Sequence, residues 1–257
     1  MSDLVLTKTT DQTLVVRINR LSRKNALTWE MYSALADALK TAEADNNIRC
    51  VLFTGSDDCF TAGNDLGEFA EGLPGDFRST PVGRFLFGLA TSLKPVVAAV
   101  NGPAVGIGTT MLLHCDLVYA GNNSRFQMPF ANLGLCPEGG SSLLLPQWLG
   151  RVRAAELLML GGAFSADDAH RLGLINRVCE PADTESTALE ACQRVSAQPP
   201  AAIRATRDLL NRSSFKALEA TMLEEGELFV ERLKSPEAAE AFRAFAEKRK
   251  PDFSGFR

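Results

Sequence analysis

Glu138 stands in a segment whose composition suits proton transfer. Pro137 precedes it and fixes its own φ near the helical value, while Gly139 and Gly140 follow it and leave space around its carboxylate. The apolar run 143–145 comes next, so a loop should turn into a short helix here. Two interpretations are open from this segment alone: Glu138 is a general base, or it is a charge in the first helical turn that favours the macrodipole.

A base of this kind needs a site that stabilises negative charge, and two glycine-containing turns could supply one. Residues 61–66 come after the apolar run 50–54, and residues 101–108 come after the apolar run 95–100. Each turn precedes a predicted helix, where backbone N–H groups can face a ligand. Two such turns meet the requirement of an oxyanion hole for two preorganised donors without side-chain bulk. Each turn alone is explained equally well as the packed corner of a βα unit.

The elements that must position these segments alternate between strands and helices, which predicts an α/β fold. They are a hairpin formed by 4–6 and 13–18, an amphipathic helix from Trp29 behind the N-cap Thr28, strands at 50–54, 95–100 and 116–120, and a helix at 106–115. After Arg151 the pattern is mostly helical, with an extended interlude at 173–179 and several helices from Pro200 onward. No Gly/Ser-rich or Pro-rich linker isolates the C-terminal part. We therefore expect a core at 1–195 and a helical region at 196–257 that packs on the core or on another subunit.

Composition excludes several classes of function. The 257 residues are 46% hydrophobic and carry 27 basic against 31 acidic side chains, which gives a net charge of -4 and no overall field for nucleic acid. No window approaches the roughly 18 apolar residues of a membrane span, and no secretory signal is visible at the start. The six cysteines are scattered, and His114 and His170 have no partner at ligand spacing. We expect reduced thiols, no metal site and a cytoplasmic location.

Four motifs, taken in order, resemble the crotonase family, also called the enoyl-CoA hydratase/isomerase family. They are Asn19-Arg20 with 24–27, then 62–66, then 101–108, and finally 244–253, so that the resemblance covers almost the whole chain. The resemblance implies a spiral of ββα units with a helical C-terminal trimerisation region. It also implies an acyl-CoA thioester substrate, a trimer or a dimer of trimers, and no cofactor beyond the coenzyme A that is part of the substrate.

The resemblance also assigns ligand contacts. The N–H groups of Asn64 and Ile107 form the oxyanion hole, and the main chain of Ala62 and Asn64 contacts the adenine of CoA. Lys24 lies near the CoA phosphates.

The resemblance further implies that two residues near the C-terminus, Phe245 and Lys248, complete this nucleotide site from a neighbouring subunit. An alternative remains open for both. Phe245 could belong to an apolar helix face with Phe242, and Lys248 could be one of several charges on a solvated helix end.

Departures from the hydratase pattern define the subfamily. Thr110 and Phe130 occupy the positions where a hydratase carries its two glutamates, so that water addition by two carboxylates should fail. Glu138 stands where Δ3,Δ2-enoyl-CoA isomerases carry their single base. We therefore predict that Glu138 moves a proton from the α to the γ carbon of a 3-enoyl-CoA during unsaturated fatty acid β-oxidation. An apolar pocket that includes Phe130 and Leu135 should raise its pKa.

Three other functions remain in competition. A ring-opening isomerase of aromatic-degradation acyl-CoAs resembles the chain but carries aspartate at the place of Glu138. The second is an enoyl-CoA hydratase with a shifted acid, and the third is a non-catalytic acyl-CoA-binding module. Ser141 and Ser142 lack the surroundings of a nucleophile, so we expect them to cap a helix, and we expect Asp65 to fix its loop by accepting backbone hydrogen bonds.

Overall fold

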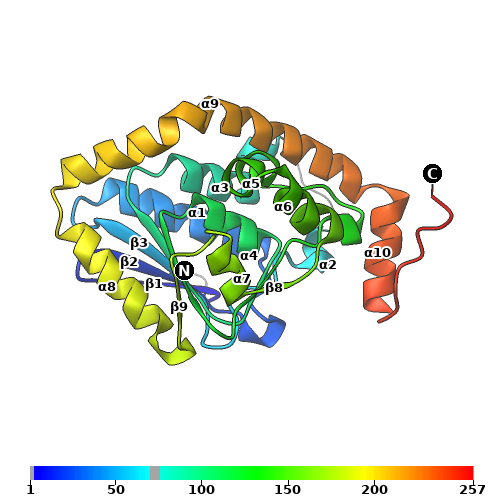
Figure 1. Cartoon of the computed structure of the whole chain (residues 1–257), viewed down its shortest axis with the longest axis horizontal. Helices are drawn as coiled ribbons and strands as arrows, with labels where there is room; N and C mark the ends of the chain where they lie inside the picture. Colours follow the sequence, from blue (N-terminus) through cyan, green and yellow to red (C-terminus); the bar gives the residue numbers. More distant parts are fainter. Residues whose placement is uncertain (1–2, 70–75, 257) are drawn as a thin grey trace.

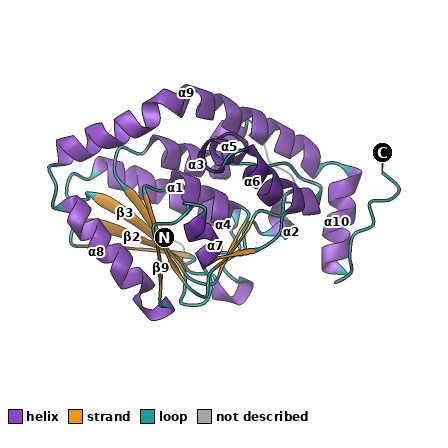
Figure 2. Ribbon diagram, in the orientation of Figure 1, coloured by secondary structure: helices purple, strands orange, loops and turns teal. Residues whose placement is uncertain are grey.

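The strands build two sheets that are enclosed between helices (Figures 1 and 2). The computed structural model describes residues 3–69 and 76–256. Within these residues, a six-stranded sheet has the order β1-β2-β3-β4-β6-β9 and a three-stranded sheet has the order β5-β7-β8. In chain order the strands are β1 (Val5–Thr10), β2 (Thr13–Ile18), β3 (Cys50–Thr54), β4 (Val96–Val100), β5 (Pro103–Val105), β6 (Leu117–Gly121), β7 (Arg125–Gln127), β8 (Phe164–Ser165) and β9 (Arg177–Cys179).

The larger sheet is parallel except at its first strand. β1 and β2 form the predicted antiparallel hairpin, and β2, β3, β4, β6 and β9 then pair in parallel. Every residue of β3 and of β4 is buried, because a parallel strand in the middle of a sheet has both faces covered. These two strands had been predicted from their continuous apolar runs, and the prediction is confirmed.

Helices pack on both faces of this sheet, α8 on one face and α1 with α3 on the other. In chain order the helices of the described residues are α1 (Trp29–Ala44), α2 (Leu66–Phe69), α3 (Pro81–Thr91), α4 (Ile107–Thr110), α5 (Ser141–Leu149), α6 (Arg151–Ala155), α7 (Ala166–Arg171), α8 (Thr184–Ser196), α9 (Pro200–Leu233) and α10 (Pro236–Ala246). Alternate residues of β3 point to opposite sides, so Leu52 packs in one cluster with Ala188 of α8, and Phe53 packs in the main core with α1 and α3. Thr28 caps α1 as predicted, since its hydroxyl accepts a hydrogen bond from the N–H of Met31.

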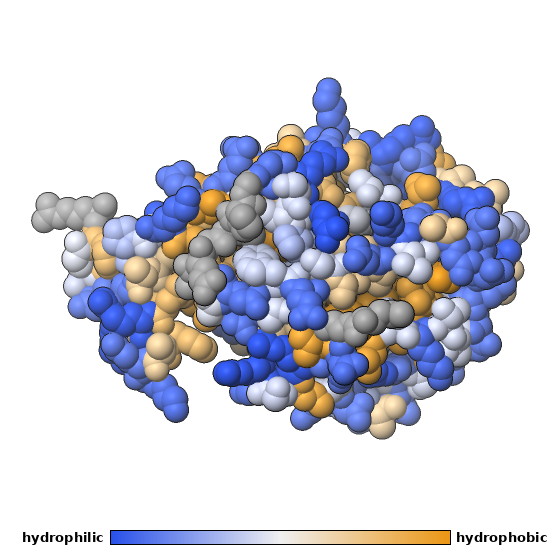
Figure 3. Space-filling view, turned by 180° about the vertical axis from the view of Figure 1, so that it is seen from behind, coloured by the Kyte–Doolittle hydropathy of each residue, from blue (hydrophilic) through white to orange (hydrophobic). Residues whose placement is uncertain are grey.

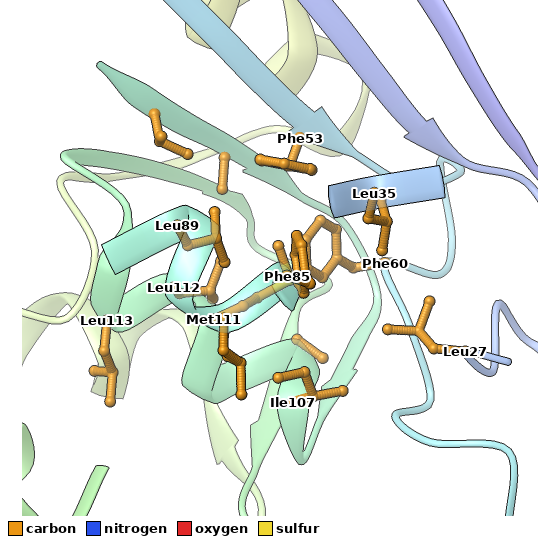
Figure 4. Packing of buried hydrophobic residues seen from close by; sticks show 14 of the residues in the cluster. Leu27, Leu35, Phe53, Phe60, Phe85, Leu89, Ile107, Met111, Leu112 and Leu113 are labelled. Atoms are coloured by element: carbon orange, nitrogen blue, oxygen red, sulfur yellow. The ribbon is translucent and has the colours of Figure 1, made fainter. Parts of the chain in front are cut away.

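The main core anchors the segments that begin at Leu27 and Ile107. Phe53 and Phe85 meet edge to face with ring centroids 5.8 Å apart, Phe53 in the upper part of Figure 4 and Phe85 near its centre. Leu27 and Ile107 lie in the lower half of that view, and both side chains are almost fully buried. Their backbones are therefore held in place by packing.

The C-terminal region differs in detail from its prediction. Residues from Pro200 onward form one helix of 34 residues, α9, followed by the shorter α10, rather than several helices. Figure 1 shows α9 lying along the top of the molecule and α10 with the C-terminus at one end. Leu218, Met222 and Phe229 of α9 are buried against the core. The buried Arg207 also links α9 to the start of β6, because its Nε forms an ion pair with Asp116 Oδ2 at 2.8 Å and Asp116 directly precedes that strand.

Two other predicted elements are shorter than expected. The helix predicted at 106–115 consists of α4 and a 3-10 turn, Met111–His114, and the extended interlude at 173–179 contains only β9. None of the helices within the described residues is long and apolar enough to cross a membrane. The architecture is the expected mixed α/β arrangement with helices at the C-terminus.

Candidate active site

The Glu138 carboxylate is enclosed in the core, with only 6% of the residue exposed. The hydroxyl of Thr110, at the end of α4, donates a hydrogen bond to Glu138 Oε1. Burial raises the pKa of Glu138 to about 8; the Thr110 hydrogen bond acts against this rise, and the negative charge of Glu225 adds to it. A carboxyl group with such a pKa is suited to taking up and releasing a proton near neutral pH.

The turn after Glu138 has a shape that requires glycine. Gly139 and Gly140 have φ values of 67° and 75°, in the left-handed region that side chains rarely adopt. A Cβ atom on Gly140 would also overlap with Leu218 Cδ1 of α9. His114 Nε2 lies 2.7 Å from the carbonyl oxygen of Gly139, and burial lowers the pKa of His114 to about 4. A neutral His114 can therefore donate to this carbonyl and support the turn.

One of the two interpretations of Glu138 and one prediction about the serines of this turn are wrong. Glu138 does not lie in the first turn of a helix, because α5 begins three residues later and the carboxylate contacts Thr110 instead. Ser141 and Ser142 do not cap α5 with their side chains: the N-cap position is occupied by Gly140, and the Ser141 hydroxyl donates to the carbonyl of Glu138 at 2.7 Å.

The cap of α5 comes from a different helix. Glu225 of α9 accepts hydrogen bonds from the N–H of Gly140 at 2.6 Å and from the N–H of Ser142 at 2.9 Å. No motif pointed to Glu225 in the sequence, although one signal marks it. Residues 218, 222, 225 and 229 recur at helical spacing and are all buried, so that an acid interrupts an otherwise apolar stripe.

The structure brings the two glycine-containing turns together. Thr61 and Ala104 form a parallel bridge, in which the N–H of Thr61 donates to Pro103 and the N–H of Val105 donates to Thr61, both at 3.0 Å. Asn64 and Ile107 each lie three residues beyond this bridge. The two turns stay in contact beyond the bridge, since a Cβ atom on Gly63 would lie 2.8 Å from the carbonyl oxygen of Val105.

The backbone N–H groups of Asn64 and Ile107 have no hydrogen-bond acceptor among the described residues. Asn64 forms a bridge with Leu27, but the hydrogen bonds of that bridge use Gly63 and Asp65, so that the N–H of Asn64 points away from Leu27. Ile107 is the first residue of α4, where a backbone N–H has no partner inside the helix. Within the described part of the chain, neither N–H makes a hydrogen bond.

Tyr32 links one of these turns to the surroundings of Glu138. Its buried hydroxyl donates a hydrogen bond to Asn64 Oδ1. Burial raises the pKa of Tyr32 well above its ordinary value, and the negative charge of Glu138 raises it further. The phenol therefore stays protonated, holds Asn64, and lies close enough to Glu138 for the charge to act on it.

Comparison with known proteins identifies the family. A model described as enoyl-CoA hydratase/isomerase matches residues 8–256. The chain belongs to the enoyl-CoA hydratase/isomerase family. It is therefore an enzyme of CoA-thioester chemistry, an isomerase or a hydratase.

Individual relatives agree on the family and differ in reaction. The chain is 34% identical to 1,2-epoxyphenylacetyl-CoA isomerase of Escherichia coli K12, over 99% of this chain and 100% of that protein. It is also 34% identical to enoyl-CoA delta isomerase 2 of Rattus norvegicus, over 92% of this chain and 61% of that protein. The solved structure of Pseudomonas aeruginosa OdaA superposes with a TM-score of 0.93 at 49% identity, over 95% of this chain and 99% of that one. Other relatives carry hydratase names, so names alone do not choose the reaction.

The residues to which the resemblance gave CoA contacts lie at two places. Lys24 is exposed beside Ala62, because the Lys24 carbonyl accepts the N–H of Ala62 at 2.9 Å. Among the described residues, no N–H donates to the carbonyl oxygen of Ala62. Asp65 fixes the same loop as predicted: it accepts a hydrogen bond from the N–H of Gly67 at 3.1 Å and pairs with Arg20 at 2.7 Å, which lowers the pKa of Asp65.

Phe245 lies in the last turn of α10, and Lys248 follows the end of that helix. Phe245 is 67% exposed, so in the single chain it is not part of the core, although its spacing from the half-buried Phe242 puts both on one face of α10. Seen from behind, hydrophobic residues gather beside the notch that separates this end of the molecule from its body (Figure 3). The nucleotide contacts of Phe245 and Lys248 stay a prediction.

Phe130 and Leu135 lie in the segment that leads to Glu138. Phe130 is buried, lies near Gly106, and meets Phe229 of α9 edge to face with ring centroids 6.4 Å apart. Leu135 is half-buried and packs against the main core. Their role as an acyl pocket stays a prediction. Among the described residues, no group of three or more His, Cys, Asp or Glu side chains could hold a metal ion.

Proposed function

We propose that this enzyme is a Δ3,Δ2-enoyl-CoA isomerase that uses Glu138 as its single base. One observation carries the proposal: a buried carboxyl group with a pKa near 8 is paired with Thr110, at the position where a hydratase of the family would carry a glutamate. The nearby acid Glu225 has both of its oxygens engaged by backbone N–H groups. One carboxylate is therefore left for proton transfer.

The chemistry needs one base and two hydrogen-bond donors. The thioester oxygen of a 3-enoyl-CoA would accept from the N–H groups of Asn64 and Ile107, which stabilise the enolate. Glu138 would remove a proton from the α carbon, so that electrons move onto the thioester oxygen. When they return, the double bond shifts to the 2 position, and Glu138 delivers its proton to the γ carbon. The product is the conjugated 2-trans-enoyl-CoA, and no electron leaves the substrate.

The pairing with Thr110 gives the two oxygens of Glu138 different tasks. Oε1 accepts from the Thr110 hydroxyl, and Oε2 is left to carry the proton between the two carbons. Exclusion of water by Phe130 and Leu135 favours return of the proton to substrate over exchange with solvent. The acyl group itself would lie against these two residues.

Residues at the surface would bind the coenzyme A part of the substrate. Lys24 would face its phosphates, and the main chain of Ala62 and Asn64 would contact its adenine. Phe245 and Lys248 would act from a neighbouring subunit of a trimer or a dimer of trimers, which suits the exposure of Phe245 in one chain. The proposal needs no further cofactor. It also includes a cytoplasmic role in unsaturated fatty acid β-oxidation, and a reducing compartment suits the six free thiols.

A second candidate is a ring-opening isomerase of aromatic-degradation acyl-CoAs. The similarity to 1,2-epoxyphenylacetyl-CoA isomerase over the full length of both proteins favours this candidate. Against it stands the longer side chain of Glu138 at a position where that type of enzyme carries aspartate. The same free N–H groups would serve either reaction.

The proposed function is tested with a 3-enoyl-CoA, whose conjugated product is followed by its thioester absorbance. Wild type should turn it over, and Glu138→Gln should lose about three orders of magnitude in kcat while still binding a CoA ligand. Glu224→Gln is the matched control, because Glu224 is an exposed carboxylate on α9. Full activity in Glu138→Gln would remove Glu138 as the base. Turnover of an epoxyphenylacetyl-CoA instead of the 3-enoyl-CoA would favour the second candidate.

A further inference from the structure

The buried acid Glu225 contacts the catalytic turn from a distant part of the chain. Only 7% of the residue is exposed, and its two carboxylate oxygens accept from different backbone N–H groups of the turn. Oε2 accepts from Gly140, and Oε1 accepts from Ser142. Gly140 and Ser142 follow Glu138 closely, so any movement of the Glu225 side chain is passed to the backbone that carries the base.

The turn has no local substitute for these contacts. Gly140 is the N-cap of α5 and has no side chain, and the first turn of α5 contains no acidic residue. The N–H groups at a helix start must find acceptors, and leaving them buried and unpaired is costly. Glu225 therefore does from α9 what a capping side chain would do locally.

The part of α9 around Glu225 also contacts the segment that precedes Glu138. The thiol of Cys136 donates to the carbonyl oxygen of Glu225 at 3.7 Å. The next residue, Gly226, lies so close to Phe77 that a Cβ atom there would overlap with the ring. Contacts from α9 thus occur two residues before Glu138 and two and four residues after it. The close packing of Gly226 against Phe77 holds α9 itself in place.

We propose that Glu225 is a positioning residue for Glu138, which fixes the turn that aims the catalytic carboxylate and strengthens it as a base through its own negative charge. This inference rests on the proposed function of Glu138. Glu225 does not touch the substrate in this account. It acts through the backbone at Gly140 and Ser142 and through the field at Glu138.

The electrostatic part follows from the surroundings of the two acids. The charge of Glu225 raises the pKa of Glu138, although burial has the larger effect. Burial also raises the pKa of Glu225, and its hydrogen bonds to Gly140 and Ser142 act against that rise. Other charged or titratable groups coupled to this pair are Tyr32 on α1, Cys136 in the turn, and Glu224 on α9, while Arg232 on α9 acts on Cys136.

The test compares three variants of the full chain in the 3-enoyl-CoA assay. Glu225→Gln keeps the shape and one acceptor but removes the charge, whereas Glu225→Asp keeps the charge and shortens the reach. Glu227→Gln removes an exposed charge two residues away on α9 and is the control. Circular dichroism and thermal unfolding show first which variants fold, and Glu225→Asp remains informative where Glu225→Gln does not fold.

We expect kcat to fall about 10- to 100-fold in Glu225→Gln with KM changed less than about threefold, because the base and not the CoA site is affected. The acid limb of its kcat/KM profile should move to lower pH, by on the order of half a unit to one unit. Glu225→Asp should lower kcat without this movement, and Glu227→Gln should match wild type in both respects. A fall in kcat with an unmoved acid limb in Glu225→Gln would overturn the proposal, since a purely structural residue gives that result.

An unchanged kcat in Glu225→Gln would also overturn the proposal. In Glu225→Asp, an unchanged kcat would show that the reach of the carboxylate is irrelevant and would count against positioning. The failure of the proposed function is recognised separately: it would appear as full activity in Glu138→Gln, whatever the Glu225 variants do. An inactive Glu138→Gln beside an unaffected Glu225→Gln would reject only the inference about Glu225.

Discussion

The hydroxyl of Thr110 donates a hydrogen bond to Glu138 Oε1, although 28 residues separate the two in the chain. Thr110 is completely buried, so this hydroxyl has no water to bind in its place. The contact fixes one carboxylate oxygen and gives the other a defined direction. It also stabilises the ionised form of the base, against the effect of burial.

Thr110→Val removes this hydroxyl with little change in shape. We expect kcat to fall about tenfold, the equivalent of one hydrogen bond to a charged group. The acid limb of the rate profile should move to higher pH, because the bond that favours the carboxylate is lost. This direction is opposite to that expected for Glu225→Gln. A Thr110→Val enzyme with an unshifted profile would show that the bond does not act on the base.

The pH profile of the wild type follows from the same carboxyl group. Proton removal needs ionised Glu138, whose pKa is raised to about 8. We therefore expect kcat/KM to increase with pH and to level off above about pH 8. A plateau that already begins near the ordinary pKa of a glutamate would contradict this assignment. His114 cannot be the source of the limb, because its pKa is lowered to about 4.

Glu138 should also make the fold less stable at high pH. Its pKa is raised from the ordinary value of 4.5 to about 8, so the folded protein holds this proton more tightly than the unfolded chain. The stability gained is complete below the unfolded value and is lost as the pH rises through the folded value. Glu138→Gln has no such loss. Relative to wild type, its free energy of unfolding should therefore increase by a few kcal/mol between about pH 5 and about pH 9.

Urea unfolding at both pH values checks this expectation. A difference between wild type and Glu138→Gln that stays constant with pH would mean that the carboxyl group titrates normally. Glu224→Gln again serves as the control, since Glu224 is exposed.

Gly140→Ala tests whether the turn and α9 are tightly joined. The new Cβ atom would overlap with Leu218 Cδ1, and the φ of 75° is unfavourable for alanine. We expect a loss of about 2–4 kcal/mol in the free energy of unfolding and a lower kcat. Gly173→Ala is the matched control: Gly173 has a φ of 76° in the turn that ends α7, where Leu174 N–H donates to the carbonyl of Ala169, but no heavy atom lies within 4 Å of a Cβ there. Equal losses in the two variants would rule out the steric contact with Leu218.

Local patterns in the sequence were enough to predict much of the fold. The hairpin, the Thr28 cap and the buried strands β3 and β4 each depend on a few neighbouring residues, whose spacing and propensity act locally. Glu138 also stood out locally, because proline and glycines surround it. The family resemblance added Asn64 and Ile107, and the structure brings their turns side by side.

Features that depend on distant contacts could not be predicted in this way. The bridge between Thr61 and Ala104 joins two segments whose pairing no local pattern fixes. The expected serine cap of α5 was wrong because Glu225, from a helix more than 80 residues away, supplies the acceptors. Phe245 fitted an apolar face by its spacing, but the short α10 leaves it exposed at the end of the molecule.

The central claim is that one carboxyl group takes the proton and returns it to the same substrate, and isotope transfer tests this claim most directly. A 3-enoyl-CoA with deuterium on the α carbon is converted by the wild type in ordinary water, and the product is analysed for deuterium at the γ carbon. We predict that part of the label appears there, because buried Glu138 exchanges its proton slowly with solvent. Product formed with no label at the γ carbon, under single-turnover conditions, would contradict proton transfer by Glu138 alone.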